Sequence, residues 1–327
     1  MPSPESHPFD RITKLADEAD AALAEGAASG DLSVVDQKLD ALEAEVVAAE
    51  RRFNPFEQML NLSAQYESQT KLLETLGIPE TLNRQSRPTL DQVRERFLAK
   101  RELLEQKIEQ GFTKLLIVPF GMSIAEMAQI YGGQLKKHQA ANRLFAEDDP
   151  ATPLELDTAT PVWRWDGYDK EEMVYFPTAF DRQNHGGLTK EQAIAKEGAW
   201  QVYLVEETPI PRQTKGKTKG GRNQLEANLT PNQYLEELKT DPSYQGEGGL
   251  TPETWLMKAL TRLEEKNEVI DDYQGKGYFN YNLGAYFPKS AFVALAFWYR
   301  DLRQARVGRN GADDHDPNIC ASFAVRV

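Results

Sequence analysis

The chain has 327 residues, 40% of them hydrophobic, which is enough for one large domain or two of ordinary size with a real core. Its formal net charge of -13 argues against general nucleic-acid binding, because the phosphate backbone repels an acidic surface. The single cysteine, Cys320, excludes an intramolecular disulfide, and the longest apolar run, Ala291 to Tyr299, is too short to span a bilayer. We therefore expect a cytoplasmic protein with no membrane segment and no nucleic-acid partner.

The first third of the chain has the apolar periodicity of helices. One heptad seam follows Asp31 and contains Val35, Leu39, Leu42, Val46, Ala49 and Phe53. A second helical pattern runs from Phe56 to Leu76, and a third begins at Thr89 and ends before Gly111. We expect residues 1–111 to form a helical module. Two forms remain open, an antiparallel bundle or hairpin and a coiled coil that makes a homo-oligomer.

The pattern changes at Phe112, where "TKLLIVPFG" predicts a buried strand. Capping boxes then predict helices after Ser123, Thr189 and Thr230, and Thr251-Pro252 opens another. The stretch "AWQVYLVEE" predicts a further strand. Helices and strands are interspersed without βαβ regularity, so residues 112–327 are predicted to form an α+β domain.

The usual signatures of enzymes and metal sites are missing. The basic stretch "PIPRQTKGKTKGG" lacks the first glycine of a phosphate loop, so it reads as an exposed loop or a weak anion site. The four histidines lie far apart, and "ADDHD", Asp313 to Asp316, lacks the alternating ligands of a calcium loop. We predict no catalytic residue, no metal and no cofactor, and we expect that the protein is not an enzyme.

The end of the chain differs from the rest in composition. From Ser290 to Val327 a crowded aromatic and aliphatic run leads into Arg, Asp, Gly and Asn, with no Lys, Glu or Met. Together with "GLTPETWL", "VIDDYQGKG" and "FTKLLIVPFGMS", the ending "GAYFPKSAFVALAFWYRDLRQARVGRNGADDHDPNICASFAVRV" resembles the variable proteins of diversity-generating retroelements, closest to the group found in candidate-phyla bacteria. The resemblance covers residues 112–327.

That resemblance implies a C-type lectin fold of the formylglycine-generating-enzyme type, with a hypervariable region from about residue 290 to residue 327. In this family the final segment is rewritten by reverse transcription of a template that is copied inaccurately at adenines. The catalytic branch of the fold needs a reactive cysteine pair, and this chain has only Cys320, so that activity is not implied.

The codon arithmetic agrees with this mechanism. Randomising both adenines of an Asn codon gives codons that end in C or T, and these never encode Lys, Glu, Met, Gln or Trp. After Ser290 only Trp298 and Gln304 belong to this forbidden set, and the family pattern holds both fixed. Diversified positions must tolerate many side chains, so we expect them to point outward from a rigid backbone.

Motif matching divides the ending into two sets. The scaffold is expected to comprise Trp298, Gln304, Ala305, Val325 and Val327. The diversified, ligand-binding set is expected to comprise Phe292, Ala294, Leu295, Phe297, Tyr299, Asp301, Leu302, Arg306, Gly308, Arg309, Asn310, Asp313, His315, Asn318, Cys320 and Phe323.

The resemblance therefore implies a binding protein whose variable surface takes an unidentified ligand, most plausibly a protein. Without it, Phe292, Leu295 and Phe297 would be read as core residues. The alternative function is structural: an assembly protein that oligomerises through its N-terminal helices while the ending merely packs.

Overall fold

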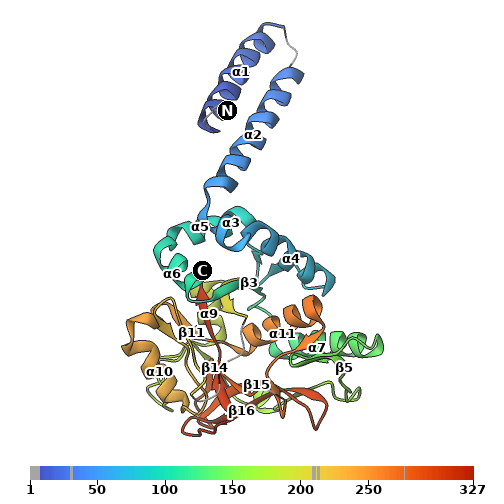
Figure 1. Ribbon diagram of the computed structural model, residues 1–327, viewed down its shortest axis with the longest axis vertical. Helices are drawn as coiled ribbons and strands as arrows, with labels where there is room; N and C mark the ends of the chain where they lie inside the picture. Colours follow the sequence, from blue (N-terminus) through green and yellow to red (C-terminus); the bar gives the residue numbers. More distant parts are fainter. Residues whose placement is uncertain (1–7, 30–31, 208–210, 212–213, 276) are drawn as a thin grey trace. The chain divides into compact units, whose positions relative to one another are not determined.

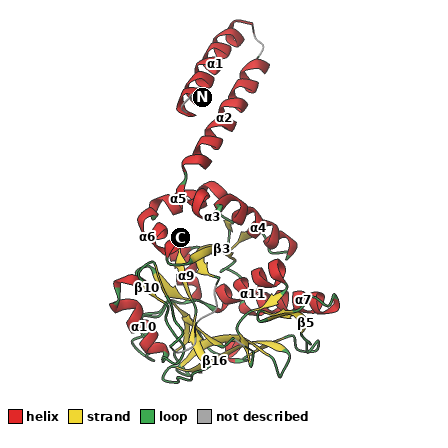
Figure 2. Cartoon of the chain, viewed as in Figure 1, coloured by secondary structure: helices red, strands yellow, loops and turns green. Residues whose placement is uncertain are grey.

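The computed structural model describes residues 8–29, 32–207, 211, 214–275 and 277–327 (Figure 1). The chain divides into two compact units, residues 1–62 and residues 63–327. Helices build the first unit, whereas helices and strands are mixed in the second (Figure 2). The α+β class with an N-terminal helical region is confirmed. None of the described helices has both the length and the apolar character needed to cross a membrane.

The first unit contains α1 (Pro8–Ser29), α2 (Ser33–Phe53) and α3 (Pro55–Leu60). Helices α1 and α2 form an antiparallel hairpin that buries Ala19, Ala22 and Val35, and Lys38 pairs with Glu18 at 2.5 Å. The predicted seam is only partly buried in the hairpin, because Leu39 on the same helix is 49% exposed. The side chains of Ala49 and Phe53, also assigned to that seam, lie outside the described residues.

The second unit begins earlier than expected, so the predicted division between residues 111 and 112 is wrong. Helix α4 (Leu62–Thr75) lies against β3 (Phe112–Val118): Gln65 Nε2 donates to the Thr113 carbonyl at 3.0 Å, and the Leu115 amide donates to Gln65 Oε1 at 2.8 Å. Leu73 of α4 is fully buried in the main core. An apolar helical face shows that a helix is packed, but its spacing does not show which element it packs against.

Three further helices of this unit begin where the sequence predicts. Ser123, Thr189 and Thr230 each accept a hydrogen bond from the third backbone amide of the helix that follows, so all three capping boxes are confirmed. These helices are α7 (Ile124–Ala140), α9 (Lys190–Glu197) and α10 (Pro231–Thr240), and α11 (Pro252–Lys266) also begins as predicted. The single helix expected from Thr89 is divided at Lys100 into α5 (Leu90–Ala99) and α6 (Arg101–Glu109). The sequence did not predict α8 (Gly167–Lys170) or the 3-10 helix η1 (Pro242–Tyr244).

One sheet of the second unit has four strands in the order β11-β18-β8-β3, each antiparallel to its neighbour. The predicted strands at "TKLLIVPFG" and "AWQVYLVEE" are its members β3 and β8 (Gln201–Glu206). The chain closes with β18 (Phe323–Arg326), which lies between β8 and β11 (Glu247–Gly249). The last strand is therefore built into the domain interior.

The other main sheet has the strand order β17-β14-β15-β16-β6, with β13 beside β15 and β7 beside β14. Its centre is an antiparallel meander of three consecutive strands, β14 to β16. The members are β6 (Val162–Arg164), β7 (Val174–Tyr175), β13 (Asp272–Tyr273), β14 (Phe279–Phe287), β15 (Phe292–Tyr299), β16 (Gln304–Gly311) and β17 (Ile319–Ala321).

Three small sheets complete the unit, and the main core lies inside it. The small sheets are β1 (Thr81–Leu82) with β2 (Gln85–Ser86), β9 (Thr218–Lys219) with β10 (Arg222–Asn223), and β4 (Phe145–Ala146) with β5 (Asp149–Pro153) and β12 (Glu268–Val269). Trp255 of α11 and Tyr131 of α7 pack edge to face at 6.2 Å in the core, which also contains Trp298 of β15. The core thus covers one face of the meander.

Candidate functional site

The geometry of β15 and β16 assigns each predicted variable residue of these strands to one of the two faces of the meander. Successive side chains of a strand alternate between faces, and residues paired across strands share a face. The register pairs Leu295 with Gly308 and Phe297 with Arg306. One face therefore carries six of the predicted residues: Leu295, Phe297, Tyr299, Arg306, Gly308 and Asn310. The opposite face contributes Ala296, Trp298, Ala305 and Val307 to the core.

Aromatic rings from other strands extend this outer face. We call the following set the aromatic patch: Trp163, Tyr273, Phe279, Phe297, Tyr299 and Arg306. Phe297 lies at its centre, with its ring centroid 4.2 Å from that of Phe279 and 5.8 Å from that of Tyr299. Tyr273 stacks on Phe279 at 4.0 Å. The rings surrounding Phe297 are half-buried, so the patch presents apolar edges to solvent.

Arg306 is the cation of the aromatic patch. Its guanidinium carbon lies 4.0 Å from the ring centroid of Trp163 and 5.9 Å from that of Tyr299. Within the described part of the chain, Arg306 forms no ion pair, and burial lowers its pKa. A guanidinium that stacks on a ring and has no carboxylate partner can donate two parallel N–H hydrogen bonds to a carboxylate of a ligand.

The expectation that every variable residue points outward is wrong for part of the set. Leu295 and Phe297 are on the outer face but only 6% and 5% exposed, because neighbouring side chains cover them. Ala294 is on the opposite face and fully buried in a small cluster with Ala285 and Phe287. Register explains the difference, since moving one residue along a strand reverses the face.

Two other predicted residues flank that small cluster. Phe292 is half-buried, and the Arg309 guanidinium lies 3.7 Å from its ring centroid. The same guanidinium is 5.2 Å from the ring centroid of Trp165. Phe292 and Arg309 share the face of Ala294, since Ala294 pairs with Arg309. The variable set is therefore divided between the two faces of the meander.

Cys320 and Phe323 are also buried, contrary to the expected exposure. Cys320 lies in β17, donates to the Phe279 carbonyl at 3.3 Å, and has a thiol whose pKa is raised well above its usual value by burial. Phe323 lies in β18, with its ring 6.1 Å from that of Tyr234. Strands β17 and β18 are interior, and the short apolar segments that form them do not reveal whether one face is solvated.

The remaining predicted variable residues are in turns and are exposed: Asp301, Leu302, Asp313, His315 and Asn318. His315 Nδ1 lies 3.2 Å from Asn228 Oδ1. In the described ranges, no three His, Cys, Asp or Glu side chains are grouped so that they could hold a metal ion. All five predicted scaffold residues, Trp298, Gln304, Ala305, Val325 and Val327, are buried, as expected for side chains that support the strands.

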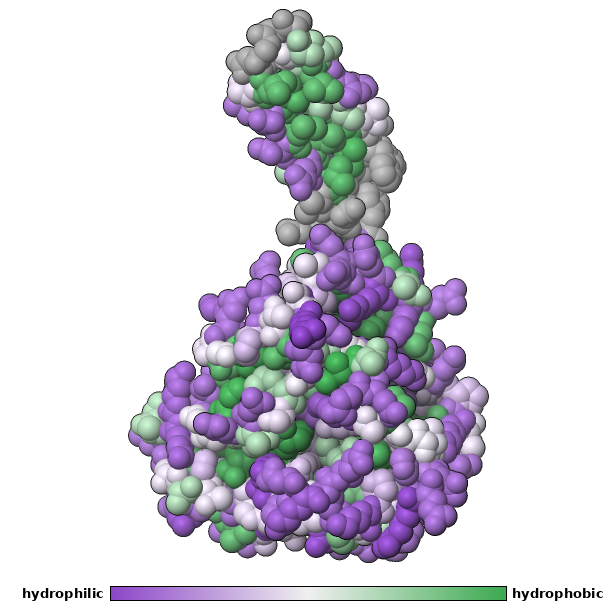
Figure 3. Space-filling view, turned by 180° about the vertical axis from the view of Figure 1, so that it is seen from behind, coloured by the Kyte–Doolittle hydropathy of each residue, from purple (hydrophilic) through white to green (hydrophobic). Residues whose placement is uncertain are grey.

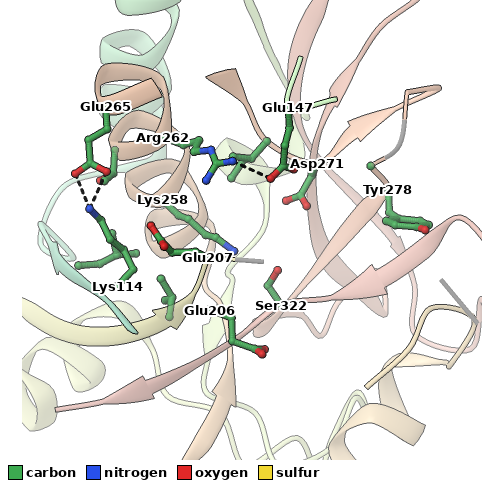
Figure 4. Close-up of a pocket in the computed structure, with 15 residues that line it drawn as sticks. Lys114, Glu147, Glu206, Glu207, Lys258, Arg262, Glu265, Asp271, Tyr278 and Ser322 are labelled. Carbon is green, nitrogen blue, oxygen red and sulfur yellow. Dashed lines mark hydrogen bonds and ion pairs between the residues drawn. The ribbon is translucent and has the colours of Figure 1, made fainter. Parts of the chain in front are cut away.

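A charged pocket of the second unit is lined by α11, β3, β8 and the segment just before β14 (Figure 4). Asp271 Oδ2 accepts hydrogen bonds from Trp255 Nε1 at 2.7 Å and from Asn280 Nδ2 at 2.8 Å. Burial raises the pKa of Asp271, while the nearby Lys258 opposes that shift. Lys258 points into the space among Glu206, Asp271 and Ser322.

Most charges of this pocket are already paired. Lys114 binds Glu265 at 2.6 Å, and Arg262 binds Glu147 at 2.8 Å. Asn280 also donates to Ser322 Oγ at 2.7 Å, which ties β14 to the segment between β17 and β18. Asn280 therefore connects Asp271 of the pocket to β14, the strand that begins with Phe279 of the aromatic patch.

Sequence reasoning missed the rings that complete the aromatic patch. Trp163 and Tyr273 lie in the short strands β6 and β13, and Phe279 is the first residue of β14; each of the three is paired with a residue distant in sequence. Their aromatic character was visible, but only the sheet order places them beside Phe297. The chain matches no protein-family model, no curated protein and no solved structure. The residue geometry therefore carries the functional conclusion.

Proposed function

We propose that this chain is a ligand-binding protein whose outer meander face, centred on the aromatic patch, is a hypervariable surface of the diversity-generating-retroelement type on a C-type-lectin-like domain. One observation carries the proposal: six positions assigned to the diversified set by motif matching share one face of two paired strands. The opposite face of the same strands belongs to the core. A protein ligand suits this face because aromatic and Arg side chains dominate binding energy at protein interfaces.

Because some residues of the outer meander face are buried, only the others can contact a ligand directly. Tyr299, Arg306 and Asn310 are half-buried and reach a partner directly, whereas Phe297 supports the rings around it. Exposed turn residues at both ends of the meander, Leu302 and His315 among them, extend the surface. A partner with a carboxylate beside apolar side chains would complement Arg306 and its flanking rings.

Two libraries of the full chain test the display surface. One randomises Leu295, Phe297, Tyr299, Arg306, Gly308 and Asn310 with codons that end in C or T. The matched library applies the same codons to Ala296, Trp298, Ala305 and Val307, which face the core. Protease resistance is measured for both on the yeast surface, followed by selection of the survivors for binding to lysozyme.

The first library should yield a much larger protease-resistant fraction, and lysozyme binders whose changes lie on the outer face. The reason is that Tyr299, Arg306 and Asn310 are only half-buried, whereas all four positions of the matched library are at most 1% exposed, where both cavities and overpacking destabilise the fold. Equal resistant fractions in the two libraries would refute display by this face. The retroelement part is tested at the gene: a near-copy of its end that differs at template adenines, beside a reverse transcriptase gene, is expected. An intact native locus with neither would refute that part.

A second function, assembly through the N-terminal helices, is favoured by exposed apolar residues on the hairpin (Figure 3). Leu23, Val34 and Leu39 are 53%, 51% and 49% exposed. Large exposed aliphatic side chains on helices are typical of helix-to-helix contacts between copies. Light scattering of the full chain should give a multimer that becomes a monomer with Leu23→Gln and Leu39→Gln together. A monomeric parent chain would exclude this function.

A further inference from the structure

A second pocket of residues 63–327 lies among the starts of α7 and α9, the segment from α8 to β7, and α11. It holds about 860 Å³ of empty space, part of it open to solvent. Its apolar lining includes Met122, Ile124 and Met173. It shares no residue with the aromatic patch, so a ligand here would be recognised independently of the proposed display surface.

In this pocket only one of the two carboxylate oxygens of the buried Glu253 accepts hydrogen bonds. The side chain of Glu253 is 0% exposed, and its Oε1 accepts hydrogen bonds from the Tyr175 hydroxyl at 2.7 Å and from Lys190 Nζ at 2.5 Å. Glu253 Oε2 is also buried and has no hydrogen-bond partner among the described residues. Leaving a buried acceptor without a donor is energetically unfavourable, and more so when the group is charged. A ligand that supplies a donor would remove this cost.

A second acceptor in the pocket lacks a partner as well. Glu171 lies just after α8, and its Oε2 is buried without a hydrogen bond to any residue that the structure describes. The lining contains five acidic and two basic side chains, an excess of negative charge. Arg164 is paired with Asp169 at 2.5 Å, and Lys190 is paired with Glu253. The negative charge that is left unpaired in the pocket favours a positively charged ligand.

The tyrosine hydroxyls do not satisfy these acceptors. Tyr175 donates to Glu253 Oε1, and burial raises its pKa well above the usual value, so it stays protonated. Tyr168 donates to the Gly308 carbonyl at 3.1 Å. Glu253 already binds one ammonium group, that of Lys190, and the same Lys190 Nζ lies 3.8 Å from the ring centroid of Phe120. The site thus accommodates an ammonium beside a carboxylate and an aromatic ring.

We propose that this pocket binds the ammonium group of a primary alkylamine. The ammonium would donate to Glu253 Oε2 and Glu171 Oε2, and the alkyl stem would lie along Ile124 and Met173. A primary ammonium suits these two carboxylate oxygens because it carries three donors, no acceptor and one positive charge. Its source is either a small free amine or the side chain of a lysine.

Methionine methyl groups report on this site directly. The full chain is labelled with ¹³C at its methionine methyls and titrated with n-butylammonium chloride at constant ionic strength. Met122 and Met173 line the pocket and should shift, whereas Met59 in α3 should not. Neutral 1-butanol and anionic butyrate should shift neither. The same titration with Nα-acetyl-lysine methylamide separates the sources: binding indicates a lysine side chain, and its absence beside n-butylammonium binding indicates a free amine.

Variants test the two acceptors. Glu253→Gln and Glu171→Gln should each weaken n-butylammonium binding by about tenfold or more, because each removes a hydrogen bond to a charged group. Glu172→Gln is the matched control, since Glu172 is exposed at the same pocket, and it should change the affinity by less than about twofold. If Glu253→Gln does not fold, the affinity of Glu171→Gln for n-butylammonium tests the proposal by itself.

Three results would overturn the proposal. One is a spectrum in which neither amine shifts Met122 or Met173. Another is an equal response to 1-butanol, which would show a merely apolar site. The third is the same shifts at lower concentration with calcium chloride, which would assign the two carboxylates to an inorganic cation.

Discussion

Replacing Glu247 by Gln should destabilise the second unit more than any other single change in its buried charge network. Glu247 has a fully buried side chain and faces two buried cations. Lys107 Nζ lies 2.7 Å from its Oε1, while Arg222 donates to it through Nε and Nη2, both at 2.7 Å. The Gln side chain would leave both cations without their common anion.

The expected magnitude follows from that geometry. Removing one member of a buried ion pair costs about 3–5 kcal/mol, because the charge that remains is no longer compensated. Lys107→Met should cost less, about 2–3 kcal/mol, since Glu247 keeps both hydrogen bonds from Arg222. Glu236→Gln is the control: Glu236 is exposed on α10, and its change should stay within about 0.5 kcal/mol.

Urea unfolding of the full chain, followed by tryptophan fluorescence, measures these differences. All five tryptophans of the chain lie between Trp163 and Trp298, so the signal reports on the second unit. Lys107 belongs to α6, and its effect therefore also tests whether α6 folds with the sheets. A cost below about 1 kcal/mol for Glu247→Gln, or a cost no larger than that of Lys107→Met, would refute the reasoning.

Two further predictions concern Asp271 and Cys320. Burial raises the pKa of Asp271, so the carboxyl group keeps its proton to a higher pH in the folded state than in the unfolded state. The contribution of this group to stability is therefore lost as the pH rises from the usual Asp range through the raised pKa. Asp271→Asn should therefore gain stability relative to the parent chain across that window in urea titrations, and a pH-independent difference would contradict this. Cys320 is fully buried with a raised thiol pKa, so a thiol reagent should label it at the global unfolding rate. Rapid labelling without denaturant would show that β17 opens locally.

The pocket around Glu253 and the aromatic patch illustrate two kinds of site. The patch joins half-buried rings and an Arg side chain on the outer face of the meander, which suits a broad partner. The pocket joins two unpartnered carboxylate oxygens inside a fold, which suits a small charged group. Because they share no residue, loss of one function should leave the other intact.

Local signals in the sequence were sufficient for several helix starts and for two strands. Ser123, Thr189 and Thr230 cap helices because each can satisfy a free backbone amide next to it, an interaction that spans only three residues. The strand at Phe112–Val118 follows equally from its apolar and β-branched composition. Such contacts depend on neighbours in the chain, so the amino-acid order decides them by itself.

Only the tertiary structure decided which elements pack together and which side chains remain accessible. Residues 63–111 have a helical pattern suited to a separate bundle, yet Gln65, Leu73 and Lys107 attach them to the second unit. Leu295 and Phe297 share the outer face with Arg306, but both are buried, and rings from distant strands pack against Phe297. Burial depends on contacts between residues far apart in the chain, and periodicity within one strand carries no record of them.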